Sequence, residues 1–167
     1  VDQIFAEFGP SIAAASIAQV HRAKLVDAMG SRYVAVKVLR PGVQRRFEQD
    51  LESYYVAARM VERFLKSARR LRPISVVDTL AESVRFEMDF RLEAAAISEM
   101  AENTRSDSGF RVPSVEWART ARTVLTMEWI DGIKLSRPAE MVAAGHNVPQ
   151  LGRYVLQTFL RHAVRNG

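Results

Sequence analysis

The chain contains no cysteine. This absence excludes disulfides, thiolate zinc sites and thiol catalysis, and it agrees with a reducing compartment. No secretory signal peptide is recognisable, and no apolar run approaches the roughly 20 residues that a membrane-spanning helix needs. We therefore expect this stretch of chain to be soluble.

Lysine is also scarce. Only four of the 24 basic residues are lysines, at positions 24, 37, 66 and 134. Such an arginine bias reflects genome composition more often than function, and a lysine inside an apolar strand, such as Lys37, stands out against it. The net charge is +5, and 48% of the 167 residues are hydrophobic, which suffices for one ordinary core.

One arginine-rich segment has two interpretations. Residues 63–72 form the basic end of a helix expected at about 43–66, and Pro73 follows them. The first interpretation is a patch for nucleic acid or for an anionic membrane surface. The second is a helix end whose arginines face solvent and complement the helix dipole. The sequence favours the second, because the arginines lack interleaved aromatic residues and form no long run.

Two segments contain the residues that indicate a function. Residues 12–21 are mostly small and follow a Gly-Pro break, and residues 34–38 form a short apolar strand around Lys37. A lysine in such a strand needs an anion or a carboxylate as its partner. Small residues let a backbone approach a ligand closely. Together the segments predict a hairpin that closes over phosphates, with a lysine reaching them from the next strand.

Protein kinases place a glycine-rich loop before a V-A-I-K strand. Here residues 34–37 are V-A-V-K, and the loop is rich in alanine. The run AAASIAQVH at residues 13–21 resembles the loop of the UbiB family of atypical kinases, and the resemblance extends over nearly the whole chain. It implies ATP and Mg²⁺ as cofactors, with Lys37 pairing the phosphates. It also implies that the loop covers the phosphates with its backbone N–H groups. The residues concerned are Ile12, Ala13, Ala14, Ala15, Ser16, Ile17, Ala18, Gln19 and Val20.

The hydrophobic pattern predicts an α+β fold. Strands are expected at 17–25, 33–39, 112–117 and 123–132, long helices at 43–66 and 75–103, and shorter helices at 138–145 and from 147. The resemblance implies a protein-kinase-like N-lobe, with a small antiparallel sheet and two long helices, in residues 1–132. Residues 43–103 would be a helical insertion in it, and residues 133–167 the first helices of a C-lobe.

The helix expected at 75–103 should supply a partner for Lys37. Counted at about 100° per residue, Glu87 falls on the flank of its apolar stripe, whereas Glu82 falls opposite. Helix geometry alone leaves two alternatives for Glu87, an inward carboxylate or a border residue paired with Arg91. Because Lys37 needs a carboxylate, we expect Glu87 to be its partner, with Glu82 as the second candidate.

The resemblance also bears on this helix. Glu87-Met-Asp89 followed by Glu93-Ala94 matches an E-x-D…E-A pattern of the family, whose E-x-D carboxylates lie near the nucleotide and bound metal. It makes Glu87 a candidate metal ligand. In that family a separate glutamate about six residues earlier pairs with the strand lysine, and Ala81 stands there in this chain.

The strand expected at 123–132 would lead to a hinge that binds adenine. On the resemblance, Met127 lies at the back of the adenine pocket, and Glu128, Trp129 and Ile130 form the hinge. The residues by themselves favour a plain central strand with a glycine turn, and a packed tryptophan. Phosphoryl transfer also needs an aspartate and metal ligands. The family places them after the point where this sequence stops, so we expect a nucleotide clamp that is inactive alone.

The function implied is that of the ATP-binding part of a UbiB-type atypical kinase or ATPase that supports ubiquinone biosynthesis. The full-length protein would associate with the cytoplasmic face of a bacterial inner membrane, and its partners would be ubiquinone-pathway proteins and lipid precursors, with no nucleic acid. The alternatives are a small-molecule kinase of the aminoglycoside or choline type, and a non-catalytic scaffold for lipids or partners. Because alanine disfavours positive φ, we hypothesise that the stiff loop favours ATP hydrolysis or lipid-linked work over protein phosphorylation.

Overall fold

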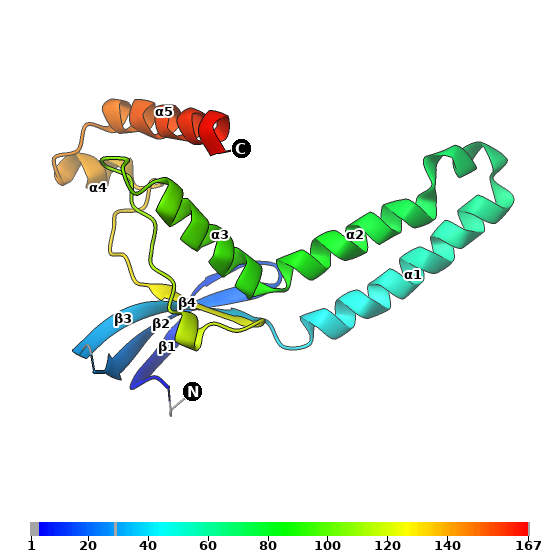
Figure 1. The fold of residues 1–167 in the computed structure, drawn as a ribbon, viewed down its shortest axis with the longest axis horizontal. Coiled ribbons are helices and arrows are strands. Elements are labelled where there is room, and N and C mark those ends of the chain that lie inside the picture. The colour runs from blue at the N-terminus through cyan, green and yellow to red at the C-terminus, as the bar shows by residue number, and fades with distance from the viewer. Residues whose placement is uncertain (1–3, 29, 167) are drawn as a thin grey trace. The chain divides into compact units, whose positions relative to one another are not determined.

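The computed structural model describes residues 4–28 and 30–166. The chain divides into two compact units, the first ending at Trp129 and the second beginning at Ile130. The first unit contains a four-stranded antiparallel sheet and three α-helices (Figure 1). The predicted α+β class is therefore confirmed, and the arrangement is consistent with a kinase-like N-lobe.

The sheet is an antiparallel meander in chain order. Its strands are β1 (Glu7–Ala14), β2 (Ala18–Asp27), β3 (Gly30–Leu39) and β4 (Val124–Glu128). The strand expected at 112–117 was wrong: Val115 forms only an isolated bridge to Met127, and the 3₁₀ helix η2 (Trp117–Arg119) follows. Pro113 has no N–H for a ladder, which keeps this segment from extending as a strand.

The two faces of the sheet have different roles. On β3, Val34 and Val36 point to one face while Ala35 and Lys37 point to the other, as the period of two requires. The valine face is packed with Phe5, Ala23 and Leu25, and a cavity of about 790 Å³ adjoins it. The Lys37 face is covered by a second buried cluster: Ala18, Leu39, Met88, Phe90, Ala94 and Leu125.

A helical hairpin follows β3. It consists of α1 (Val43–Phe64) and α2 (Pro73–Glu87), joined by the 3₁₀ helix η1 (Lys66–Leu71). Figure 1 shows α1 starting after β3 and α2 returning beside it. The two helices share a small core of their own, made of Leu51, Ala58, Val77 and Ala81. Gly42 starts α1 with a φ of 76°, a conformation that favours glycine.

The single helix expected at 75–103 was wrong. Helix α2 ends at Glu87, and a separate helix α3 (Phe90–Asn103) begins after a two-residue break. Asp89 is the N-cap of α3: its backbone is extended, and its carboxylate accepts a hydrogen bond from the N–H of Arg91 at 3.1 Å. Aspartate is among the strongest N-cap residues. Because α3 starts anew, helical phase counted from α2 does not carry over to it.

The second unit contains α4 (Pro138–Ala143) and α5 (Val148–Asn166). Met141 and Thr158 are its buried residues among those described. Within residues 4–28 and 30–166, no helix has both the length and the apolar composition needed to cross a membrane.

Candidate functional site

An ion pair between Lys37 and Glu93 is the centre of the candidate site. The Lys37 Nζ lies 2.6 Å from Oε2 and 2.8 Å from Oε1 of Glu93, so the ammonium donates to both carboxylate oxygens. The two side chains are 25% and 39% exposed. The predicted pairing with Glu87, and with Glu82 as second candidate, was therefore wrong: both lie exposed on α2.

Glu93 was missed because α3 is separate from α2. It lies in the first turn of α3, six residues after Glu87, whereas the resemblance implied a glutamate about six residues before Glu87. Ala81, which stands at that earlier position, is buried in the core of the helical hairpin. The available signal was Asp89, a strong N-cap residue that restarts the helix and so changes which carboxylate faces the sheet.

The neighbours of the pair hold it in place. Phe90 is fully buried beneath it, and the Lys37 Nζ lies 4.8 Å from the centroid of the Phe90 ring. A cation at that distance from an aromatic face is attracted to it. The N–H of Phe90 donates to the carbonyl of Arg122 at 2.9 Å, which ties the start of α3 to the segment before β4. Lys37 and Glu93 thus meet on a buried aromatic platform.

Asp89 fixes the start of α3 electrostatically. Its carboxylate accepts hydrogen bonds from Arg91 Nη2 at 2.6 Å and from Arg91 Nε at 2.9 Å. The side-chain hydrogen bond from Arg91 is the largest cause that lowers the pKa of Asp89 from 3.8 to about 2. The carboxylate is therefore ionised at neutral pH and is already occupied as a cap and as the partner of Arg91.

The alanine-rich run is mostly strand. Ala13 pairs with Val20 and Ala14 with Gln19 in the β1–β2 ladder, which leaves residues 15–17 as the turn. The N–H of Ala15 donates to the carbonyl of Ala18 at 2.8 Å and closes this turn. In the described part of the chain, Arg72 is the only non-glycine residue with positive φ. The turn thus forms without the left-handed conformations that glycine provides.

The turn and the ion pair lie on neighbouring strands. Val20 on β2 is the direct partner of Lys37 on β3, and Leu125 on β4 flanks Lys37 from the other side. The turn begins only a few residues before Val20. The register brings the turn near Lys37, and the idea that both belong to one site stays a prediction. The part of Ile12–Val20 outside residues 15–17 is strand.

The predicted hinge residues are not equivalent. Met127 pairs with Ala35, on the Lys37 face, and packs against its buried cluster. The carboxylate of Glu128 is bound by Arg111 and by the N–H of Ser114 at 3.3 Å, so its side chain is already occupied. Ile130 is the first residue of the second unit.

Trp129 takes part in a stack that the sequence did not indicate. The guanidinium of Arg22 lies 3.6 Å from the centroid of the Tyr33 ring and 5.2 Å from that of the Trp129 ring. Arg22 pairs with Ala35 on β3, so this stack lies on the same face as Lys37, further from the turn. It gives Trp129 a packing partner, as the residue-level interpretation of a tryptophan at a strand end expected.

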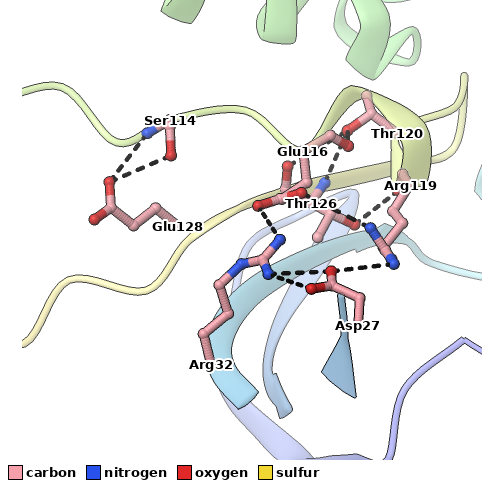
Figure 2. Close-up of polar contacts among 8 residues, drawn as sticks. All are labelled: Asp27, Arg32, Ser114, Glu116, Arg119, Thr120, Thr126 and Glu128. Carbon is pink, nitrogen blue, oxygen red and sulfur yellow. Dashed lines mark hydrogen bonds and ion pairs between the residues drawn. The ribbon is translucent and has the colours of Figure 1, made fainter. Parts of the chain in front are cut away.

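A second ionic group lies on β3, and sequence reasoning missed it. Figure 2 shows Arg32 between the carboxylates of Asp27 and Glu116, at 2.9 and 2.8 Å, with Arg119 also near Asp27 at 3.5 Å. The hydrogen bond that Arg32 donates to Glu116, followed by the one that it donates to Asp27, raises the pKa of Arg32. These contacts join the β2–β3 turn to a segment more than 80 residues away, so no local pattern predicts them.

A buried hydroxyl completes this second group. Thr126 is fully buried, and its hydroxyl donates to the carbonyl of Arg119 at 2.7 Å (Figure 2). Its N–H donates in turn to the hydroxyl of Thr120 at 3.2 Å. With both arginines facing both carboxylates and the hydroxyls paired, this group is internally satisfied and serves to hold the segment before β4.

The described residues offer little for a metal ion. Among residues 4–28 and 30–166, no three histidine, aspartate or glutamate side chains cluster as ligands would. Glu87, the candidate metal ligand, is exposed at the end of α2, and its role there stays a prediction. The donor set that is present, a lysine ammonium beside an exposed backbone turn, suits anionic oxygens such as phosphates.

Sequence comparison identifies a family that covers the whole chain. The profile of the ABC1 atypical kinase-like domain matches residues 1–167. The chain is 34% identical over 167 residues to a protein of Marinobacter nauticus named probable protein kinase UbiB, covering 99% of this chain and 30% of that protein. It is 33% identical over 167 residues to the protein of the same name from Aeromonas hydrophila, with the same two coverages.

A plant protein gives a similar match. The chain is 34% identical over 170 residues to the Arabidopsis thaliana protein named ACTIVITY OF BC1 COMPLEX KINASE 8, chloroplastic, covering 100% of this chain and 22% of that protein. The chain thus spans less than a third of the length of these three curated relatives.

Proposed function

Because the chain belongs to the ABC1 atypical kinase-like family, we propose that it is the ATP-binding part of a UbiB-type atypical kinase or ATPase. The observation that carries this proposal is the Lys37–Glu93 ion pair, set beside the turn at residues 15–17. A strand lysine held by a helix glutamate is the arrangement by which kinases position the α- and β-phosphates.

Each residue has a role in this proposal. Glu93 orients the Lys37 ammonium, which has a third N–H for a phosphate oxygen beyond its two contacts with the carboxylate. At the turn, the N–H groups of Ser16 and Ile17 face the same phosphates, because the N–H of Ala15 already donates to Ala18. Met127, beside Ala35, forms the apolar back of the adenine pocket, and backbone groups of residues 128–130 bind the base edge. ATP brings the phosphoryl group when it is bound, and Mg²⁺ would neutralise its charge.

For the whole protein, the proposal is supported by family membership alone. The names of the relatives support kinase-like chemistry, and we propose ubiquinone biosynthesis as the pathway, with pathway proteins and lipid precursors as partners. We further propose that the full-length protein works at the cytoplasmic face of a bacterial inner membrane. A stiff alanine turn would restrict the γ-phosphate geometry. Ala15→Gly tests that idea at the turn itself, because Ala13 and Ala14 lie in the β1 ladder.

The test is calorimetric titration of magnesium ATP into a polypeptide that contains this chain and has the length of its relatives. Lys37→Ala should weaken binding at least tenfold, since a charge-assisted contact to phosphate is lost. Lys24→Ala is the matched control, because Lys24 lies on the same face of the sheet, opposite Tyr33. A folded wild type that binds no ATP, or a Lys37→Ala variant that binds equally well, would remove the proposal and favour a non-catalytic scaffold.

A further inference from the structure

The positive charge of this chain is concentrated at one place. We define the hairpin tip as residues 59–72, the end of α1 with η1 and the residue before α2. The tip contains one acidic residue, Glu62, and six basic ones: Arg59, Arg63, Lys66, Arg69, Arg70 and Arg72. The rest of the chain has 18 basic and 18 acidic residues, so the net charge of +5 equals that of the tip.

The arginines of the tip surround a cavity. Its volume is about 490 Å³, and its lining is Arg59, Glu62, Arg63, Arg69, Arg72 and Ile74. The Glu62 carboxylate accepts the N–H of Ile74 at 3.3 Å, and Arg69 donates to the carbonyls of Glu62 and Arg63 at 2.7 and 3.4 Å. In the part of the chain that the structure describes, none of the six basic side chains of the tip forms an ion pair with a carboxylate.

The same tip exposes large apolar side chains. Phe64 is 70% exposed, Leu71 is 65% exposed and Leu65 is 53% exposed. Met60, one turn before Phe64 on α1, is 56% exposed. Exposed apolar side chains ringed by arginine and lysine are typical of segments that lie in a membrane interface, where the apolar groups enter the acyl boundary and the cations meet the headgroups.

We propose that the hairpin tip docks on an anionic phospholipid membrane. Arg59, Arg63 and Arg72 bind headgroup phosphates at the cavity, and Phe64, Leu65 and Leu71 enter the acyl boundary. The 22 residues of α1 span about 33 Å, so docking leaves the Lys37 site clear of the lipid surface. This inference does not depend on ATP binding, because it uses no residue of the candidate nucleotide site.

Two other occupants fit the tip less well. A second copy of the tip would bring two sets of uncompensated positive charge together, which is repulsive. Single-stranded nucleic acid is bound through aromatic stacking platforms, and three of the four exposed apolar residues of the tip are aliphatic. The structure thus changes the interpretation of residues 63–72: solvent-facing arginines alone do not account for the apolar side chains among them.

The experiment is sedimentation of the 167-residue chain with vesicles of phosphatidylglycerol and phosphatidylcholine in equal parts, or of phosphatidylcholine alone. We expect binding to the anionic vesicles only. Each basic residue near such a surface contributes about a fivefold factor, so Arg63→Gln/Arg70→Gln should weaken binding about 25-fold. The control, Arg45→Gln/Arg46→Gln, removes the same charge from exposed residues at the start of α1 and should change binding less than threefold.

A second variant tests the apolar contacts. Phe64→Ser/Leu71→Ser keeps the charge and should lower binding at least fivefold, while circular dichroism reports an unchanged helix content. No binding to the anionic vesicles would overturn the proposal, and so would equal losses from the tip and control arginine pairs. Unchanged binding by the serine variant, or tip-dependent binding to an oligonucleotide that exceeds vesicle binding, would also overturn it.

Discussion

Strand β3 contributes a cation to each face of the sheet, and the two cations have different numbers of carboxylate partners. Lys37 meets one carboxylate, that of Glu93, on the face covered by α3. Arg32 lies on the other face, between Asp27 and Glu116, and Arg119 adds a second cation there. The Arg32 group therefore has two cations and two carboxylates, all no more than 29% exposed.

The difference separates a group that stabilises the fold from a pair that can still bind a ligand. In the Arg32 group each charge has a protein partner, and the group joins two distant segments of the chain. In the Lys37 pair the Glu93 side chain is 39% exposed, and the ammonium retains a donor for a further anion. We infer that substitution in the first group mainly lowers stability, whereas substitution in the second mainly lowers ligand affinity.

The largest expected effect on stability comes from Asp27→Ala. It removes the carboxylate that both arginines contact and leaves their charges half-buried with Glu116 alone. The free energy of unfolding should fall by about 2 kcal/mol, because two half-buried cations then share one carboxylate. Urea denaturation of the chain measures it. A loss as small as that of an exposed ion pair would show that the group does not hold the fold.

Glu93→Gln should act on affinity instead. The neutral amide no longer fixes the ammonium of Lys37, so we expect magnesium ATP to bind about tenfold more weakly, a difference of roughly 1.4 kcal/mol. Glu82→Gln is the control and should leave affinity unchanged, since Glu82 is exposed on α2 and does not contact Lys37. Calorimetry measures both variants. The reverse ranking would restore Glu82, the second predicted partner, as the functional one.

Asp89→Asn tests the start of α3 through pH. The folded-state pKa of Asp89 is lowered from 3.8 to about 2. The ionised carboxylate therefore stabilises the fold above about pH 4, and this contribution is lost as the pH falls from 4 toward 2. Thermal melting at pH 5 and at pH 2.5 should show a smaller difference for the asparagine variant than for wild type. Equal differences would mean that Asp89 does not titrate in this window.

The smallest effect is expected for Glu102→Ala. Glu102 forms an exposed ion pair with Arg105, three residues later at the end of α3, and the two side chains are 62% and 76% exposed. Exposed pairs of this kind contribute little, so the free energy of unfolding should change by less than about 0.5 kcal/mol. The same urea measurement serves as the reference for Asp27→Ala. Equal losses of stability in the two variants would show that the Arg32 group contributes no more than an exposed ion pair.

Local sequence signals predicted the parts of the site that depend on neighbouring residues. Alternation predicted β2 and a short apolar run predicted β3, and the apolar surroundings of Lys37 correctly indicated an anionic partner. The identity of that partner depended on a helix break at Met88 and Asp89, where no proline or glycine marks the end of α2. Counting helical phase across this break selected Glu87.

Longer-range features gave no comparable signal. Glu116 and Arg119 approach the β2–β3 turn only because η2 and β4 bring them there. The apolar residues of the hairpin tip were visible in the sequence, but their exposure was not, since a helix of this pattern normally buries such residues. Whether a side chain is buried was therefore the information that the sequence lacked.

The helical hairpin has a consequence for the cost of forming the site. Lys37 and Glu93 are 56 residues apart in the chain. Closing an unstructured loop of that length would cost about 4 kcal/mol in chain entropy. Here α1 and α2 run side by side around their own small core, so the two ends of the intervening segment return to each other as the hairpin folds. Any change that melts the hairpin should therefore separate the lysine from its glutamate, although neither residue is altered.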